Sequence, residues 1–264
     1  MDFGPGTENK PEPQQAGRNS RTAGIENLLF EPFRQFFATS PVACPYIPGR
    51  AERKLIVELG GSGSAAFYDD LSRAGFRRSH HFAYRPACPG CASCVPVRIV
   101  VEQFCHTRST RRVRNANRDL CGSLVSSQAT SEQFRLFATY QRLRHGDSDM
   151  ALMRYGDYRG MVEDTPVRTA IAESRDGRGS LVAASLIDLL DDGFSAVYSF
   201  FDPHQTKRSL GIWSVLWLVE ECRRRGLPFV YLGYWIADSP KMAYKSRFPA
   251  LERLDKAGWT AFAR

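Results

Sequence analysis

The chain has 264 residues, 43% of them apolar and 24% charged, which is enough for one large domain or two small fused ones. No stretch approaches the roughly 18 consecutive apolar residues of a membrane-spanning helix, and the N-terminal residues lack the apolar segment of a signal peptide. We therefore expect a cytoplasmic protein. The formal net charge of +8 favours polyanions such as nucleic acids, although charge alone does not establish that one binds.

The N-terminal part begins with a polar segment. Residues 1–24 are rich in Gly, Pro, Asn and Gln and are expected to be disordered, because they bury too little apolar surface to offset the entropy of ordering. Ordered structure is expected to begin near Ile25. The patterns that follow predict a strand, a helix and two strands, over residues 54–59, 64–75, 80–85 and 95–101.

The C-terminal part predicts helices followed by a strand-rich core. Three helices are expected over 107–120, from Thr130 onward, and over 150–163. Strands are expected over 167–173, 181–190, 194–201 and 229–235, with helices over 209–225 and 240–247. The hairpin signal Asp191-Asp192-Gly193 joins two of these strands. This order is that of an N-acetyltransferase-like α/β core. We divide the ordered chain into an N-terminal half, 25–120, and a C-terminal half, 121–264.

Four cysteines could bind a metal. Cys88, Cys91 and Cys94 lie on a Pro- and Gly-rich turn, and Cys44 lies upstream. Four thiolates suit zinc or an iron–sulfur cluster, and close spacing lets several sulfurs converge. The alternative is a turn with reduced thiols that bind nothing, and the spacing leaves both open.

Five arginines follow on a predicted helix with no acidic residue among them. Arginine suits bidentate contacts with phosphate, so we favour an RNA contact over a merely solvated helix face. The five are Arg108, Arg111, Arg112, Arg114 and Arg118.

A second polar segment joins a strand to a helix. The loop from Asp202 to Gly211 precedes a helix N-terminus, where free amides and the helix dipole favour an anion. Lys207 and Arg208 add positive charge. Acetyltransferases bind coenzyme A with a similar loop, but Trp213 stands where a small residue is required, so acetyl-CoA is disfavoured. The 3′ end of a charged tRNA is our alternative, with Ser209, Leu210 and Gly211 around it.

Polar and aromatic residues are dense after the last core strand. A core strand and loop would explain the aliphatic residues there, but not the density of groups that can donate, accept and neutralise charge. These groups are Tyr234, Lys241, Tyr244, Lys245 and Glu252.

The same region carries a family resemblance. The runs YLGYWI at 231–236 and KMAYKSRFPALE at 241–252 resemble the C-terminal signature of the arginyl-tRNA–protein transferase family. The similarity is closest to its bacterial branch, the aspartate/glutamate leucyltransferases. CPYIPGR at 44–50 and GFRRSHHFAYRPACPGCASCVPVRI at 75–99 match independently. The similar sequence extends from about Cys44 to Glu252.

The resemblance implies both a fold and an activity. The fold would be two fused acetyltransferase-like (GNAT-like) halves, with mixed central sheets flanked by helices. The activity would be transfer of leucine from leucyl-tRNA to proteins that begin with Asp or Glu, which marks them for degradation in the N-degron pathway. No cofactor would be required for the chemistry. In relatives the cysteine region binds a metal or cluster, which matches Cys44, Cys88, Cys91 and Cys94.

A mechanism of this kind needs a proton acceptor, an ester site and a cation. We expect Asp202 or Glu252 near the acceptor amine and Tyr234, Tyr244 and Lys245 around the ester. The acceptor's acidic side chain needs a cation, for which Arg50, Arg78 and Lys245 are the candidates. Three alternatives remain open: arginine as the transferred residue, an acetyl-CoA-dependent acetyltransferase, and a zinc-containing RNA-binding module without catalysis.

Overall fold

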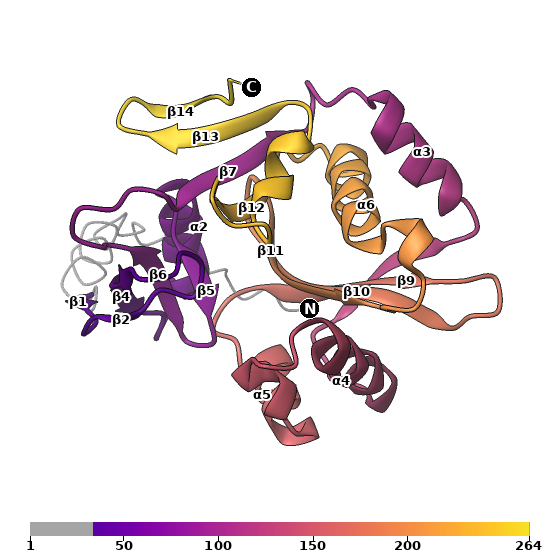
Figure 1. Cartoon of the computed structure of the whole chain (residues 1–264), viewed down its shortest axis with the longest axis horizontal. Coiled ribbons are helices and arrows are strands. Elements are labelled where there is room, and N and C mark those ends of the chain that lie inside the picture. The colour runs from indigo at the N-terminus through magenta and orange to yellow at the C-terminus, as the bar shows by residue number, and fades with distance from the viewer. Residues whose placement is uncertain (1–33, 264) are drawn as a thin grey trace, which may run out of the picture. The chain divides into compact units, whose positions relative to one another are not determined.

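An eight-stranded mixed sheet is the largest layer of the computed structural model, which describes residues 34–263 (Figure 1). Every neighbouring pair is antiparallel except β11 and β12, which are parallel and joined by a crossover helix. The expected tail, 1–24, and the expected start of order at Ile25 lie outside the described residues. The strands, in spatial order, are β14 (Gly258–Ala261), β13 (Leu251–Asp255), β7 (Val95–Val100), β12 (Phe229–Trp235), β11 (Gly193–Phe201), β10 (Leu181–Leu189), β9 (Thr169–Arg175) and β8 (Cys121–Ser126).

Helices cover both faces of this sheet. The crossover helix α6 (Leu210–Arg224) packs on one face, and α3 (Arg108–Ala116) packs on α6. On the opposite face lie α4 (Ser131–Arg144) and α5 (Tyr155–Glu163) (Figure 1). Strand alternation explains the two layers, because on β9 Ala170 and Ala172 join the core under α6, whereas Ile171 joins the core under α4.

A smaller sheet packs against this assembly. It has the order β1 (Phe36–Ala38), β4 (Lys54–Glu58), β6 (Phe82–Pro86) and β5 (Arg77–Ser79), and α2 (Ser64–Arg73) packs beside it. A two-stranded ribbon pairs β2 (Val42–Ala43) with β3 (Ala51–Glu52). Three single-turn 3₁₀ helices complete the elements, η1 (Asp149–Leu152), η2 (Thr206–Arg208) and η3 (Ala243–Arg247).

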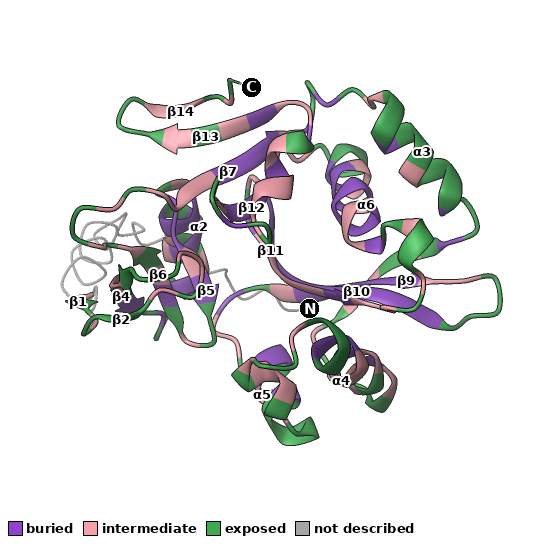
Figure 2. Cartoon of the chain, viewed as in Figure 1, coloured by how far each residue is buried: buried purple, intermediate pink, exposed green. Residues whose placement is uncertain are grey.

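Buried residues of the two sheets pack against each other, and Figure 2 shows where the buried residues lie. Tyr68 of α2 and Val57 of β4 share an apolar cluster with Leu190 and Tyr231 of the large sheet region. Strand β7, from the expected N-terminal half, lies between β12 and β13. The expected division at residue 120 therefore separates segments that share one sheet.

The expected fold class, mixed α/β with sheets flanked by helices, is confirmed. The hairpin between β10 and β11 forms at the expected place, and α4 begins with the expected reciprocal cap between Thr130 and Gln133. The sequence patterns did not indicate strands β8, β13 and β14 of the large sheet, or the short strands β1, β2, β3 and β5. No helix within residues 34–263 is long and apolar enough to cross a membrane.

The parallel strands β11 and β12 separate part of the way along their length. They pair only from Gly193 to Ser195 on β11 and from Phe229 to Tyr231 on β12. Beyond these residues they diverge, and β12 carries a register shift against β7 between Tyr231 and Gly233. We call the diverging segments, 196–201 of β11 and 232–235 of β12, the fork.

Candidate active site

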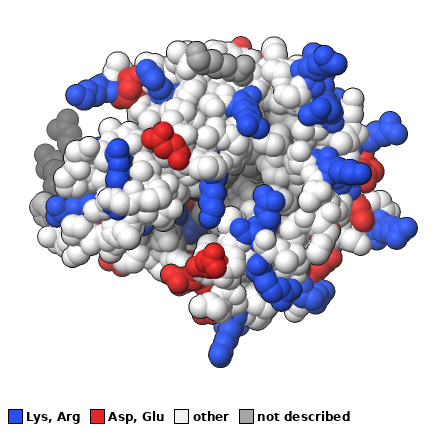
Figure 3. All heavy atoms as spheres, viewed as in Figure 1, with Lys and Arg blue, Asp and Glu red and all other residues white. Residues whose placement is uncertain are grey.

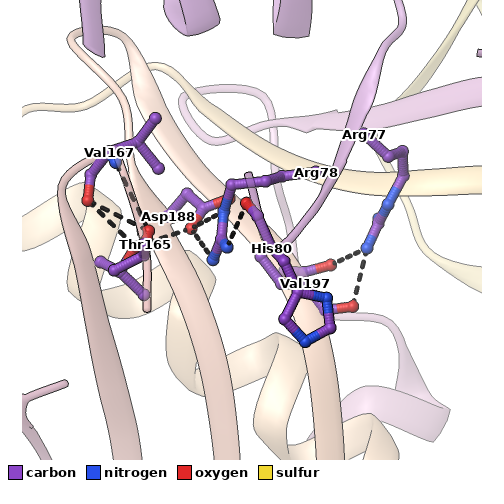
Figure 4. A network of polar contacts seen from close by, with 9 residues as sticks. Arg77, Arg78, His80, Thr165, Val167, Asp188 and Val197 are labelled. Atoms are coloured by element: carbon purple, nitrogen blue, oxygen red, sulfur yellow. Dashed lines mark hydrogen bonds and ion pairs between the residues drawn. The ribbon is translucent and has the colours of Figure 1, made fainter. Parts of the chain in front are cut away.

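A guanidinium from the smaller sheet fills the fork. Arg77 of β5 donates from Nη2 to the carbonyl oxygens of Ala196 and Val197 on β11, over 2.7 and 2.8 Å (Figure 4). On the β12 side it packs against Gly233, where a Cβ would lie 2.6 Å from Arg77 Cδ. Because Arg77 contacts both branches, it acts as a wedge between them.

Lys245 is the second cation of the fork. It lies in η3, is only 8% exposed, and donates from Nζ to the carbonyl oxygen of Tyr234 over 2.6 Å. Its Nζ also lies 3.3 Å from the sulfur of Met242. Burial and, to a smaller extent, the positive charge of Arg77 lower the pKa of Lys245 to about 7. An amine with this pKa can take up or release a proton near neutral pH.

The structure brings Tyr234 and Tyr244 to the same place as Lys245. The hydroxyl of Tyr234 donates to the carbonyl oxygens of Gly75 and Tyr84, over 3.0 and 3.2 Å. Burial raises the pKa of the Tyr234 and Tyr244 hydroxyls, so both remain protonated donors at neutral pH. Three of the five expected catalytic residues therefore lie at the fork.

The two expected proton acceptors are engaged elsewhere. Asp202 directly follows β11, and its carboxylate accepts from the backbone of His204 and the side chain of Gln205 in the same loop. Glu252 on β13 accepts from Arg98 Nε over 2.8 Å. Arg98 in turn stacks over Phe229, with its guanidinium carbon 3.5 Å from the ring centroid. These contacts hold both carboxylates in place, and none of them is with a residue of the fork.

Arg78 was expected to bind the acceptor, and the structure gives it a different place. Its guanidinium forms a buried ion pair with Asp188 of β10, at 2.7 Å, and the two side chains are 1% and 0% exposed (Figure 4). Asp188 also accepts from Thr169, and Arg78 donates to the carbonyl oxygen of His80. This correction follows from the ion pair, since a cation already neutralised inside the protein cannot meet a ligand.

The remaining substrate candidates are exposed. Lys241 lies in the loop before η3, close enough to His145 that it helps to lower the pKa of that imidazole, after burial. Arg50 lies far from the fork in sequence and donates from Nη1 to the sulfur of Cys91 over 3.2 Å. Together with Arg53 and Cys91 it lines a surface pocket of about 370 Å³.

The expected anion loop adopts a tight conformation before α6. Ser209 is exposed with φ of 53°, and its carbonyl oxygen accepts from Ile212 and Trp213 at the start of the helix. Leu210 is buried, and Gly211 lies against Phe201, where a Cβ would meet the ring at 3.0 Å. The amides of Ile212 and Trp213 are therefore bonded within the turn, which leaves those of Leu210 and Gly211 as the donors for the expected anion site.

The expected RNA-binding segments lie next to one another. Asn117, at the end of α3, donates from Nδ2 to the carbonyl oxygen of Arg208 over 2.8 Å, and Arg208 pairs with Asp119. Lys207 is exposed. All five arginines of the α3 segment are exposed and make no ion pair within residues 34–263, and Lys and Arg side chains gather over this part of the surface (Figure 3). The five are Arg108, Arg111, Arg112, Arg114 and Arg118.

The four expected metal ligands are neighbours. Burial and, to a smaller extent, the neighbouring thiols of Cys88, Cys44 and Cys91 raise the pKa of the Cys94 thiol to about 11. Cys88 accepts from the backbone of Arg53 over 3.3 Å. The donor set suits a soft metal or a cluster, but no three Cys, His, Asp or Glu side chains among residues 34–263 stand in a metal-binding arrangement.

Sequence reasoning missed Arg77 and Gly233. Arg77 directly precedes Arg78, the expected acceptor ligand, and the sequence gives no reason to prefer one of two adjacent arginines. Gly233 interrupts an aromatic strand, and an isolated glycine in a strand signals a close approach of another group. That signal, read at YLGYW, could have indicated the wedge.

Comparison with known families covers most of the described chain. Residues 42–112 match the model described as "Arginine-tRNA-protein transferase, N terminus", and residues 132–255 match the corresponding C terminus. These matches define a transferase of the aminoacyl-tRNA-dependent class.

Two relatives specify the branch. The aspartate/glutamate leucyltransferase of Paramagnetospirillum magneticum is 57% identical over 228 residues, which span 86% of this chain and 93% of the relative. That of Rhodospirillum rubrum is 55% identical, with the same coverage. The chain therefore belongs to the arginine-tRNA-protein transferase family, in the branch whose relatives carry the name aspartate/glutamate leucyltransferase, and the resemblance stated above is confirmed. A solved structure, L-PGS from Bacillus licheniformis, aligns with a TM-score of 0.41 and 12% identity over 69% of this chain and 54% of that one, which is too low to inform function.

Proposed function

We propose that this protein transfers leucine from leucyl-tRNA to the N-terminal Asp or Glu of acceptor proteins, which marks those proteins for degradation. The observation that carries the proposal is the identity of more than half of the aligned residues with relatives that bear this name, over nearly their whole length. The reaction is aminolysis: the acceptor amine attacks the ester carbonyl, its C–N bond forms, and the ester C–O bond to the tRNA breaks.

The residues at the fork suit this reaction. The acceptor α-amine has an ordinary pKa of about 7.7–8.0, so a sizeable fraction is neutral near pH 7. Positioning two substrates then supplies much of the acceleration. Tyr244 can stabilise the oxyanion of the tetrahedral intermediate, and Lys245, which Tyr234 holds through its carbonyl oxygen, can serve either the ester or the acidic side chain of the acceptor. Asp202 and Glu252 remain our candidates for accepting the surplus proton.

The donor tRNA would lie across α3 and the loop before α6. Five exposed arginines and Lys207 supply unpaired positive charge, and the first turn of α6 supplies amides for a terminal phosphate. The bond from Asn117 to the carbonyl oxygen of Arg208 holds these two segments together. The phosphate backbone of the tRNA would thus contact α3, and its aminoacyl end would contact the neighbouring loop before α6.

The proposal is tested with purified full-length protein, radiolabelled leucyl-tRNA or arginyl-tRNA, and peptides that begin with Asp, Glu or Ala. We expect label from leucyl-tRNA on the Asp and Glu peptides alone. Transfer from arginyl-tRNA would change the donor and keep the reaction class. Binding of tRNA without transfer to any peptide would contradict the enzyme and favour an RNA-binding module.

A metal or cluster at the four cysteines is a separate proposal, supported by the proximity of their thiols. Such a group would stabilise the turn 88–94 and the ribbon of β2 and β3. The test reconstitutes the reduced protein with Zn²⁺, or with Fe²⁺ and sulfide, and measures bound metal. A variant with Cys88 and Cys91 changed to Ser should lose the metal, whereas one with the exposed Cys105 and Cys121 changed to Ser should keep it.

A further inference from the structure

The fork contains two cations that have no carboxylate partner. Arg77 donates only from Nη2, to two backbone carbonyls, and Lys245 donates to one carbonyl and one thioether. Neither forms an ion pair within residues 34–263. Elsewhere in the same structure, enclosed cations are neutralised: Arg78 pairs with Asp188, and Arg98 pairs with Glu252.

An enclosed cation without a counterion is unfavourable. Removal from water costs free energy that carbonyl dipoles offset only in part. The lowered pKa of Lys245 records that cost, since burial and the positive Arg77 both disfavour its charged form. The fork is therefore a site that an anion would stabilise, and the Nη1 and Nε groups of Arg77 are the donors that make no hydrogen bond to residues 34–263.

The position of the fork indicates which kind of anion would bind there. The exposed arginines of α3, which packs on α6, are our proposed contacts for the extended polyanion. The fork lies between β11, β12 and β5 of the smaller sheet, where Lys245 is buried and Arg77 is half-buried. A leucyl group carries no negative charge that could neutralise the site. A single carboxylate on a short side chain fits both the enclosure and the charge.

We propose that Arg77 and Lys245 bind the side-chain carboxylate of the acceptor's N-terminal Asp or Glu, and so determine the specificity of the transfer. The inference rests on the proposed function and assigns its acceptor site. Arg77 is held by β11 and by Gly233, so it is already oriented before the acceptor arrives. Binding of the carboxylate would also draw a proton onto Lys245.

The test compares acceptor peptides that differ only in Asp against Asn at the first position. Arg77→Met and Lys245→Met are compared with Arg85→Met, which removes an exposed charge from the neighbouring strand β6. We expect the wild type and Arg85→Met to prefer Asp. In Arg77→Met the ratio of kcat/KM for Asp over Asn should fall about 10- to 100-fold, with the KM for leucyl-tRNA unchanged, and Arg77→Lys should recover part of the ratio.

An equal loss with both peptides, leaving the ratio unchanged, would overturn the inference and leave Arg77 as a wedge alone. Calorimetry with Asp and Asn dipeptides gives a second readout that needs no transfer. The Asp dipeptide should bind more tightly and take up more protons near pH 7, and Lys245→Met should abolish the difference in proton uptake. Equal binding of the two dipeptides by the wild type would overturn the inference. Absence of transfer from any charged tRNA, with the Asp preference intact in calorimetry, would contradict the proposed function and support the site.

Discussion

The guanidinium of Arg77 occupies the space that a side chain on Gly233 would need. A Cβ at Gly233 would lie 2.6 Å from Arg77 Cδ and 2.7 Å from its guanidinium carbon, and Gly233 has φ of 72°, a conformation that favours glycine. The wedge between β11 and β12 therefore depends on a residue without a side chain in β12.

This relationship predicts that Gly233→Ala lowers both activity and stability. The substituted residue is strained at its φ angle, which costs about 1 kcal/mol, and it displaces Arg77 from the fork. Gly226→Ala is the matched control, because Gly226 has φ of 70° and nothing within 4 Å of an added Cβ. Urea unfolding should show that the backbone strain lowers the free energy of unfolding in both variants. Transfer assays should show a loss of activity only for Gly233→Ala. Equal activity of the two would show that the wedge is not needed.

The elements that the sequence predicted correctly are those with local signals. The reciprocal cap of Thr130 with Gln133 and the hairpin at Asp191–Gly193 each depend on residues a few positions apart. Strand β8 was missed because its residues Cys121–Ser126 are largely polar and lie at a sheet edge, where burial does not impose an alternating pattern.

The site could be predicted only in part, for the same reason. Tyr234, Tyr244 and Lys245 lie within twelve residues of one another, so their density was visible in the sequence. The choice between Arg77 and Arg78 depends on contacts with Ala196 and Asp188, which are more than 100 residues away. No local pattern records which of two adjacent arginines meets a buried carboxylate.

Removing one charge of the buried ion pair should destabilise the protein more than removing both charges. Asp188→Asn leaves the Arg78 guanidinium buried without a counterion, and we expect a loss of about 3–5 kcal/mol in the free energy of unfolding. The double variant Arg78→Met with Asp188→Leu should recover part of this loss, because neither charge remains. Chemical denaturation of Arg78→Met, of Asp188→Leu and of the double variant measures the coupling. Additive losses would mean that the pair contributes nothing beyond its separate side chains.

Lys245 should make the stability depend on pH above neutrality. Its pKa is about 7 in the folded chain against 10.5 ordinarily, so between these values the unfolded chain binds the additional proton. Stability then rises with pH over that window, by a few kcal/mol at most given about 1.4 kcal/mol per pKa unit. Lys245→Met removes this contribution. From pH 7 to pH 10, the free energy of unfolding should therefore rise more in the wild type than in the variant. Parallel pH profiles of the two proteins would show that Lys245 keeps its ordinary pKa.

The arginines of α3 should set the salt dependence of tRNA binding. Arg111 and Arg112 are exposed and unpaired within residues 34–263, so each can neutralise a phosphate and release a counterion. Changing both to Ala should weaken tRNA binding and reduce the slope of log K against log salt by about 2. Arg135→Ala with Arg142→Ala removes the same charge from exposed positions of α4, on the opposite face of the sheet, and should leave the slope unchanged. If both double variants shift the slope equally, tRNA responds to net charge rather than to α3, and the proposed path of the tRNA along this helix is wrong.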